Sequence, residues 1–500
     1  MIAIFSVFAI TPLFKPEFFA SHDMLAPVYR LLELDTCIKD RVAFARWFPD
    51  MYGGRGGPFF NYYSPFSYYV AEVFHLAGLG YVNSVKACYL LSFVLSGVFM
   101  HLFAKDKVGR YPAVLAGVLY MYAPYHLYDV YVRGDLAESF AFVFFPLVLY
   151  SIDRGRVVLG AVSYALLILT HNISALLFTG FLFFYVTLFR RELSLKKVLP
   201  ALLFGLLLSA FYWIPALFEK HMVNIENVLI FAPEESFLGV YDTLNKIGSM
   251  PLLLALSALV ISKERRTRIF GVIFFGLIFL MTPYSAFFWN LPLAAYVQFP
   301  WRLLALAALV VSLLGGIAAS GRSRRTVLIL SFLVVLSSFS FIGYSEHITV
   351  SSQDITRQEL KNLNTGLTYG HEYLPKGARI LNSVVENDVE LVSGHGLLET
   401  TEKGCKSLAF EYAGDGAIAR VNTYYFPGWT VYIDGKRTVP RIDEAGQMLL
   451  SIPEGRHKIL LKFEDTAVRK VSVALSTIAF MALALQTVRA YRAASRPRRH

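Results

Sequence analysis

Acidic and basic side chains gather at a few points of an otherwise apolar sequence, and their types could do chemistry there. The first group comprises His22, Asp23, Arg46 and Asp50. The second group, Asp129, Arg133, Asp135 and Glu138, falls within ten residues. His171, Glu219 and Arg302 each stand at the end of a long apolar run. Because charge is costly at membrane depth, such residues indicate a functional site.

The residue types in these groups suit a substrate that carries a lipid phosphate. A carboxylate such as Asp23 can act as a general base or hold a metal. Arginines at the depth of the lipid headgroups can bind a phosphate, and Arg46, Arg133 and Arg302 are the candidates. His22, Asp50, Asp135, Glu138, His171 and Glu219 are then candidates for binding or orienting the substrate.

Each candidate also has a purely structural interpretation. Asp23 could cap a helix or be a surface charge, and a lone interfacial arginine more often anchors a helix by snorkelling. His171 could be a hydrogen-bonded helix end. The glycines between Gly53 and Gly57 resemble a phosphate loop, but they follow no strand and lack the Walker spacing, which favours a flexible turn.

The elements that must position these residues are mainly membrane-spanning helices. Of the 500 residues, 56% are hydrophobic and 17% are charged, whereas a soluble chain carries roughly a quarter charged residues. A helix needs about 20 residues to cross the hydrocarbon core. Twelve runs approach that length: 1–14, 86–104, 111–126, 137–152, 157–170, 173–189, 197–217, 247–262, 269–283, 301–319, 326–344 and 470–488.

The positive charges define a sidedness for these spans. The net charge of +11 could suggest nucleic acid, but the Lys and Arg residues sit in short loops between spans and in the tail 490–500, so no nucleic-acid partner is expected. The positive-inside rule makes those loops and both termini cytoplasmic. Counting the apolar stretch 61–82 as a span would invert every later loop, so it is expected to lie in the outer interface.

The three cysteines, Cys37, Cys88 and Cys405, have no metal-like spacing, and Cys88 lies in an apolar helix. We therefore expect neither a disulfide framework nor a zinc site.

The segment 345–469 has a different character from the rest of the chain. Apolar runs give way to short alternating stretches, which predict β-strands at 417–425, 429–434, 447–452 and 457–464. Asp434-Gly435 is a hairpin-turn signal, and Pro453-Glu454-Gly455 is a second turn. We expect an extracytoplasmic β-sandwich-like domain tethered by the final transmembrane helix, 470–489.

The charged residues belong to a series of motifs that cover almost the whole chain in order. The motifs are Asp23, Arg46-Trp47-x-Pro49-Asp50, Tyr62-Tyr63-x-Pro65, the run from Ala123 to Glu138 with Asp129, Arg133 and Gly134, Leu169-Thr170-His171-Asn172, Phe211-Tyr212-Trp213-x-Pro215-Ala216-x-x-Glu219, Gln298-Phe299-Pro300-Trp301-Arg302, Glu372-Tyr373-Leu374-Pro375 and Phe426-Pro427-Gly428-Trp429. These motifs resemble one family of bacterial and archaeal membrane proteins, named "6-pyruvoyl-tetrahydropterin synthase-related", and the similar YfhO-type proteins.

The resemblance implies kinship with GT-C glycosyltransferases, which take a sugar from a polyprenyl-phosphate donor on the outer face. An acidic residue in the first outer loop is the usual catalytic residue there, which corresponds to Asp23. The pterin-synthase name does not fit, because that soluble enzyme uses a histidine zinc cluster and this sequence shows none. The short first helix departs from the pattern.

The resulting prediction is a polytopic α-helical membrane protein of about 12 transmembrane helices with a GT-C-like domain over 1–344. Residues 15–83 would form a first extracytoplasmic loop with interfacial helices. The protein would lie in the cytoplasmic membrane with its active site outside.

The predicted activity is an inverting sugar transfer to a cell-surface glycan, lipid or protein. No cofactor is certain, and a divalent metal such as Mg or Mn is left open. The alternatives are a transporter or flippase of lipid-linked glycans and a non-catalytic scaffold of surface-polymer assembly.

Overall fold

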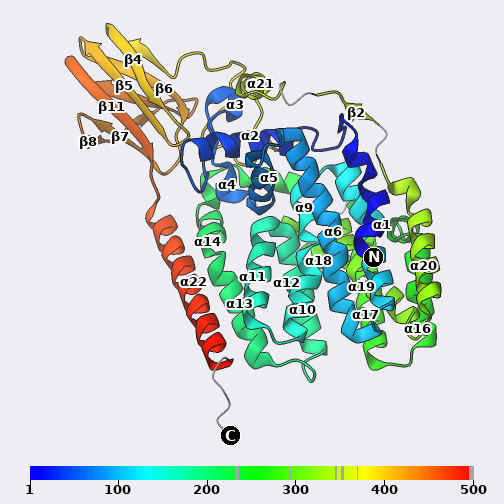
Figure 1. The fold of residues 1–500 in the computed structure, drawn as a ribbon. Coiled ribbons are helices and arrows are strands. Elements are labelled where there is room, and N and C mark those ends of the chain that lie inside the picture. Colours follow the sequence, from blue (N-terminus) through cyan, green and yellow to red (C-terminus); the bar gives the residue numbers. More distant parts are fainter. Residues whose placement is uncertain (231–235, 293, 344–345, 351–353, 369, 495–500) are drawn as a thin grey trace.

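A bundle of apolar helices forms the body of the protein, and two β-sheets lie at one end of it (Figure 1). The computed structural model describes residues 1–230, 236–292, 294–343, 346–350, 354–368 and 370–494. Within these residues, four apolar segments are long enough to cross a membrane: Tyr81–Val108, Leu136–Asp153, Pro300–Ala318 and Ala467–Arg489. We call the end that carries the sheets the β end.

Three further apolar pairs of helices are sharply bent at a short break. The pair Leu195–Leu208 and Ala210–Phe218 bends by 66°, Val240–Ile247 and Ser249–Ile261 by 95°, and Arg265–Leu280 and Pro283–Trp289 by 90°. If each pair is one span, the described residues hold seven, and the shorter apolar helices Ile2–Phe14, Val157–Thr170 and Asn172–Leu188 come in addition. The twelve predicted runs are therefore helical, but many are shorter or more bent than the sequence suggests.

In chain order, the helices are α1 (Ile2–Ile10), α2 (Ala26–Lys39), α3 (Met51–Gly54), α4 (Phe59–Tyr62), α5 (Phe66–Leu76), α6 (Tyr81–Val108), α7 (Pro112–Met121), α8 (Pro124–Tyr128), α9 (Leu136–Ala141), α10 (Phe144–Asp153), α11 (Val157–Thr170), α12 (Asn172–Leu188), α13 (Leu195–Leu208), α14 (Ala210–Phe218), α15 (Val240–Ile247), α16 (Ser249–Ile261), α17 (Arg265–Leu280), α18 (Ala286–Trp289), α19 (Leu304–Ala318), α20 (Arg324–Ser337), α21 (Arg357–Leu363) and α22 (Ala467–Ala494). Most helices are joined by short connections, but longer segments lie between α14 and α15, between α20 and α21, and between α21 and α22.

Short helices α2 to α5 cover the β end of the bundle (Figure 1). The apolar stretch 61–82 contains α5, which has 11 residues, far fewer than the roughly 20 that a span needs. A tilted or interfacial placement therefore suits α5, and α6 begins the next crossing at Tyr81.

The sheets are built from antiparallel strands of the C-terminal part. One sheet has the order β3-β6-β10-β9 and the other β4-β5-β11-β7-β8. Their strands are β3 (Val389–Ser393), β4 (Gly396–Lys403), β5 (Ser407–Gly414), β6 (Ala417–Tyr424), β7 (Trp429–Ile433), β8 (Lys436–Thr438), β9 (Arg441–Ile442), β10 (Gln447–Ile452) and β11 (Gly455–Phe463). We call residues 389–463 the β-region. Two strands near the bundle, β1 (Phe18–Phe19) and β2 (His347–Ile348), pair separately.

All four predicted strands are confirmed as β6, β7, β10 and β11. Ile433 pairs with Lys436 across Asp434-Gly435, which confirms the predicted hairpin turn. Pro453 and Glu454 instead connect β10 and β11, which belong to different sheets. Strands β3 to β5 and helix α21 were not predicted. Strand β4 is exposed at nearly every position, so its sequence shows no alternation, whereas β5 does alternate, with Leu408, Phe410 and Tyr412 buried, and was missed.

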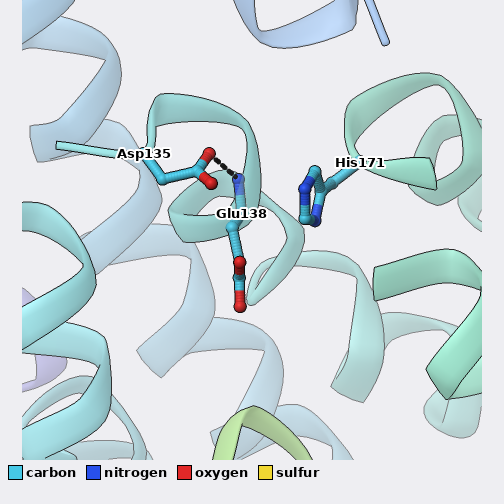
Figure 2. Close-up of side chains that lie close together, drawn as sticks. All are labelled: Asp135, Glu138 and His171. Atoms are coloured by element: carbon cyan, nitrogen blue, oxygen red, sulfur yellow. Dashed lines mark hydrogen bonds between the residues drawn. The ribbon is translucent and has the colours of Figure 1, made fainter. Parts of the chain in front are cut away.

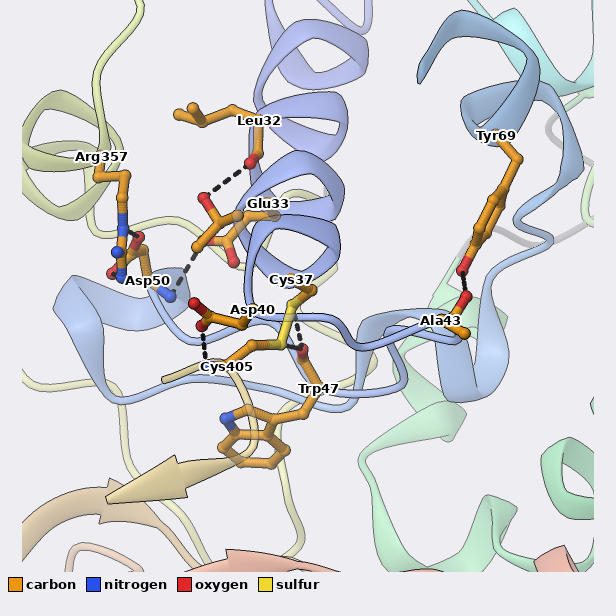
Figure 3. Close-up of a disulfide and its surroundings, with 11 residues drawn as sticks. Leu32, Glu33, Cys37, Asp40, Ala43, Trp47, Asp50, Tyr69, Arg357 and Cys405 are labelled. Atoms are coloured by element: carbon orange, nitrogen blue, oxygen red, sulfur yellow. Dashed lines mark hydrogen bonds and ion pairs between the residues drawn. A yellow bond between two sulfur atoms is a disulfide. The ribbon is translucent and has the colours of Figure 1, made fainter. Parts of the chain in front are cut away.

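A disulfide joins the bundle to the β-region, and the prediction that no disulfide forms is wrong. Cys37 near the end of α2 bonds to Cys405, which precedes β5, across 368 residues (Figure 3). The Asp40 carboxylate accepts a hydrogen bond of 2.6 Å from the Cys405 amide beside it. Spacing could not reveal this pair, because the bond depends on tertiary approach rather than on a local motif.

Candidate active site

Two loops at the β end are joined through their backbones, and this places Asp23 beside the second charged group. The His22 amide donates to the Val132 carbonyl and the Asp23 amide to the Arg133 carbonyl, both at 2.9 Å. Gly134 follows with φ +70°, and a Cβ at this position would overlap the Ser21 side chain. A glycine is therefore needed where the two loops meet.

The segment from Asp129 to Glu138 folds into two tight local structures. Asp129–Arg133 forms one turn of π-helix, a feature that often occurs at functional sites. Asp135 then caps α9, because its Oδ1 accepts a hydrogen bond of 2.9 Å from the Glu138 amide. The sequence D-x-x-E is a capping signal in its own right, and Figure 2 shows the Asp135 carboxylate against the Glu138 amide, which places the two residues side by side.

Arg133 is buried and surrounded by acceptors. It forms ion pairs with Asp129, with Glu138 Oε2 at 2.7 Å and with Asp135 Oδ2 at 3.2 Å. Its guanidinium group also lies over the Trp301 ring, 4.9 Å from the centroid. Arg133 therefore is not a snorkelling anchor; it is the centre of a charged network.

Arg302 approaches the same carboxylate from another span. Its Nε lies 3.2 Å from Glu138 Oε2, and its Nη1 donates to Gln298 Oε1 at 2.7 Å and to the Val297 carbonyl at 2.9 Å. Glu138 thus links two arginines that lie 169 positions apart in the sequence. Each stands at the N-terminal end of an apolar segment, Leu136–Asp153 for Arg133 and Pro300–Ala318 for Arg302. The predicted convergence of these two arginines is what the structure shows.

Asp135, Glu138 and His171 form a compact group of potential metal ligands, with the ligand atoms of all three within 4.8 Å of one another. His171 belongs to the junction of α11 and α12, and its ring faces the two carboxylates (Figure 2). Carboxylate and imidazole donors suit a divalent transition metal such as Mn²⁺. Both carboxylates also bind Arg133, so a metal at this place would share them with an arginine.

Asp23 is the most accessible carboxylate of this region, with a side chain that is 33% exposed. Its Oδ2 lies 3.4 Å from Arg30 Nη1. Burial raises the pKa of Asp23 to about 6, and Arg30 opposes that rise. Burial, together with the nearby Arg133, lowers the pKa of His22. At neutral pH the loop therefore presents an ionised carboxylate beside a neutral imidazole.

Arg30 is a site residue that the sequence analysis missed. It is buried in α2, seven positions after Asp23, and donates to the Tyr68 hydroxyl at 2.9 Å as well as to Asp23. Its guanidinium group also lies 4.7 Å from the Tyr63 ring centroid. The sequence did contain a signal for Arg30: it is the one arginine among the apolar residues of the helix that follows Asp23.

We call the whole group at this place the central cluster. It comprises Asp23, Arg30, Asp129, Arg133, Asp135, Glu138, His171 and Arg302.

Arg46 and Glu219 lie in a second group, at the joint between the bundle and the β-region. Glu219 Oε2 accepts bonds from Arg469 Nη2 at 2.9 Å and from Asn61 at 2.9 Å. Arg46 bonds to the Phe211 carbonyl at 2.7 Å and lies 3.7 Å from Asp465. We call the group Arg46, Asn61, Glu219, Asp465, Thr466 and Arg469 the joint cluster.

Asp50 is placed apart from both clusters. It pairs with Arg357 and lies 3.6 Å from Lys361, both on α21 (Figure 3). Its amide donates to Glu33 on α2 at 3.0 Å. The glycine segment that follows Asp50 packs closely against the segment around Ser383. At Gly53 a Cβ atom would lie only 2.7 Å from the Ser383 carbonyl oxygen. This loop holds the segment that leads to the β-region.

A family model for the "6-pyruvoyl-tetrahydropterin synthase related domain; membrane protein" matches residues 60–345, more than half of the chain. The chain belongs to this family. Its members are thus recognised by the membrane part that contains most of the central cluster. No curated protein matches the sequence.

Three solved structures are similar to this chain at low sequence identity. Arabinofuranosyltransferase AftD from Mycobacteria matches at 13% identity and a TM-score of 0.42, over 68% of this chain and 26% of that protein. ArnT from Cupriavidus metallidurans, bound to undecaprenyl phosphate, matches at 15% and 0.40, over 67% and 62%. The oligosaccharyltransferase AglB from Archaeoglobus fulgidus, in complex with an inhibitory peptide and a dolichol-phosphate, matches at 12% and 0.45, over 70% and 55%.

The chain thus spans between about a quarter and three fifths of the length of these proteins. At such identities the function must be argued from the central cluster itself.

Proposed function

We propose that this protein is an inverting glycosyltransferase that moves a sugar from a polyprenyl-phosphate donor to an acceptor hydroxyl. The observation that carries the proposal is the central cluster: an accessible carboxylate stands among buried arginines where two loops meet at one end of the bundle. That combination serves a reaction in which a hydroxyl loses a proton and a phosphate leaves.

Asp23 is the proposed general base. With a pKa of about 6 it is ionised at neutral pH yet basic enough to accept a proton. It would take the proton of the acceptor hydroxyl while that oxygen bonds to the anomeric carbon. The bond from that carbon to the phosphate oxygen breaks on the opposite face, so that the polyprenyl phosphate leaves with the bonding electron pair.

Arg133 and Arg302 are the proposed partners of the leaving phosphate. Both already share Glu138, so a phosphate oxygen could take over contacts that this carboxylate makes now. Stabilising the charge that develops on the leaving group is usually the largest single gain in such a step. Glu138, Asp135 and His171 would orient the arginines and the sugar.

Arg46, Asp50 and Glu219 receive structural roles in this proposal. Their partners are Asp465, Arg357 and Arg469, all in or next to the C-terminal part of the chain. They therefore hold that part against the bundle, and we no longer assign them to the donor phosphate or the sugar.

A divalent metal remains a proposed addition to the site. Asp135, Glu138 and His171 would hold it, and its charge would neutralise oxygens of the donor phosphate. Four carboxylates face three arginines in the described central cluster, so a further cation is electrostatically acceptable there. Loss of transfer on chelation, with recovery on adding Mn²⁺ or Mg²⁺, tests this addition.

We place the β end of the molecule on the outer side of the cytoplasmic membrane. The basic loops of the sequence support this orientation. So does the disulfide between Cys37 and Cys405, because such bonds persist in oxidising compartments. The β-region would then stand beside the site and hold the acceptor.

A transporter of lipid-linked glycans is less well supported. Transporters of this kind carry broken helices in corresponding positions of two repeats. The three bent pairs among the described residues all fall between residues 195 and 289, so they do not form such a matched set. A non-catalytic scaffold would tolerate loss of Asp23.

The test is transfer by the purified protein in liposomes that contain a mixture of polyprenyl-phospho-sugars. We expect release of polyprenyl phosphate that depends on an acceptor glycan. Absence of release by the wild-type protein with every donor would contradict the proposal. Arg302→Ala should weaken donor binding, and an unchanged donor affinity would remove the phosphate role from that residue.

A further inference from the structure

Arg30 has two sets of contacts on opposite edges of its guanidinium group. Nη1 faces Asp23 at 3.4 Å and the hydroxyls of Tyr63 and Tyr68 at 3.3 and 2.9 Å. Nη2 and Nε both donate to the Leu367 carbonyl, at 2.6 and 3.2 Å. One side chain thus joins the candidate base to the segment that leads into the β-region.

The segment that carries this carbonyl is closely fitted to the bundle. We call residues 364–367 the strap. The Thr365 carbonyl accepts a bond of 3.0 Å from the Tyr52 amide. A Cβ on Gly366 would lie 2.5 Å from the Tyr52 hydroxyl oxygen, so no larger residue fits there without movement.

Leu367 itself is held in an unusual backbone conformation. Its φ is +56°, which is costly for a residue with a branched side chain. Its side chain is buried, and its carbonyl is aimed at Arg30. Backbone strain of this kind persists only where surrounding contacts enforce it, and it clusters at functional sites.

We infer that Arg30 is a positioning residue that couples the docking of the strap to the placement of Asp23. The inference rests on the proposed function, because it assigns a role to Arg30 through Asp23. With the strap docked, Leu367 fixes one edge of the guanidinium group and the other edge holds the carboxylate. When the strap lifts, Arg30 loses two of its bonds and the carboxylate loses its fixed partner.

The charges around Asp23 make this coupling measurable. The charged groups that act on its carboxylate are Arg30 on α2 and Arg133 and Asp135 from the second loop. Tyr63 and Tyr68, next to α2, and Tyr89 on α6 are the other titratable groups that interact with it. Arg30 favours the ionised form, so its removal should raise the pKa of Asp23. A cation within about 4–6 Å is worth roughly one to three pKa units.

The experiment compares Arg30→Gln, Arg30→Lys and Gly366→Ala in the transfer assay over a range of pH. We expect Arg30→Gln to move the acidic limb of the rate profile upward by about one unit and Arg30→Lys to restore most of that shift. Gly366→Ala removes no charge but displaces the strap. It should move the limb in the same direction, and the double variant Arg30→Gln with Gly366→Ala should be no worse than Arg30→Gln alone.

The matched control is Arg55→Gln. Arg55 is also a buried arginine that holds the C-terminal part, through the Ser383 carbonyl at 2.6 Å, but it does not contact Asp23. Its loss should loosen the docking of the segment around Ser383 and leave the strap bound to Arg30, so the acidic limb should not move. Lower rates for the Arg30 variants with an unmoved limb would mean a merely structural role and would overturn the inference.

A second measurement does not depend on activity. Hydrogen exchange of a peptide that contains residues 364–367 should be faster in Arg30→Gln than in wild type, and faster by a smaller factor in Asp23→Asn, because a coupling between two sites acts in both directions. Unaltered exchange in Arg30→Gln would overturn the coupling even if transfer is observed. Faster exchange in a protein without any transferase activity would instead leave the coupling standing and refute only the proposed function.

Discussion

The central cluster and the joint cluster both combine buried arginines with carboxylates, one of which is partly exposed in each, yet they are built differently. In the joint cluster each carboxylate has its own arginine: Glu219 binds Arg469, and Asp465 lies beside Arg46. In the central cluster the described carboxylates outnumber the arginines, and Asp129 Oδ2 is buried without a hydrogen-bond partner. A buried polar atom without a partner is rare in a folded protein and calls for an explanation such as a catalytic role or a bound water or ion.

The two clusters also differ in what they connect. The joint cluster ties α14 to α22 and to the end of the β-region. The central cluster is assembled from the first loop, the second loop and the starts of two spans. Mutations in the joint cluster should therefore lower the stability of the fold, whereas mutations in the central cluster should lower the rate of transfer.

The largest effect is expected for Asp23→Asn. The amide cannot accept the proton of the acceptor, so the transfer rate should fall by roughly 10²–10⁴ with little change in thermal stability. Asp388→Asn is the control, because Asp388 pairs with Lys403 in the β-region, away from the central cluster. Undiminished transfer by Asp23→Asn would refute the assignment of the base.

Glu219→Gln should have the next largest effect, on folding. Arg469 is fully buried between Phe426 and Phe463, and loss of its partner would leave an uncompensated charge, at a cost of about 3–5 kcal/mol. Thermal unfolding in detergent measures this. A Glu219→Gln protein that is as stable as wild type but has lost donor binding would return Glu219 to the substrate site.

Replacing both cysteines of the bond, Cys37→Ser with Cys405→Ser, should cost about 2–5 kcal/mol of stability. The joint cluster and the bonds of Asp50 remain in this variant, so the β-region should stay docked with reduced stability. Limited proteolysis with and without reductant measures the loss. Equal protease resistance of the variant and the wild type would show that the noncovalent joint suffices.

The smallest effect is the pH dependence of the wild-type protein. Asp23 acts only as the ionised form, and its pKa is raised to about 6. The rate should therefore be constant at higher pH and half-maximal near pH 6, decreasing as the pH is lowered through that value. A profile without an acidic limb in that range would separate the rate from the titration of Asp23.

The sequence predicts the parts of this protein that follow from periodicity and charge. Apolar runs locate the helices, and alternation locates β6, β7, β10 and β11. The grouping of Arg133, Glu138 and Arg302 was predictable because all three sit at the same ends of apolar runs. The bends at Ser209 and Gly248 were not, since a run of apolar residues looks the same in a straight and in a bent span.

Long-range partners were the part that the sequence could not reveal. Arg46 and Glu219 are of the same residue types as Arg133 and Glu138 and are likewise buried. Only their partners, Asp465 and Arg469, distinguish them. Arg30 was missed for the same reason, because its contact with Leu367 crosses 337 positions. Such contacts depend on how the β-region docks, which no local pattern records.

The bond between Cys37 and Cys405 also sets an order for biogenesis. During synthesis Cys37 must remain a thiol until a partner 368 positions later has been made and brought to the same side of the membrane. A chain that has not yet reached Cys405 therefore carries a Cys37 thiol that the folded protein has lost. A thiol-directed label at Cys37 would mark such copies, so this single bond is a covalent record that synthesis has passed Cys405 and that the β-region has reached α2.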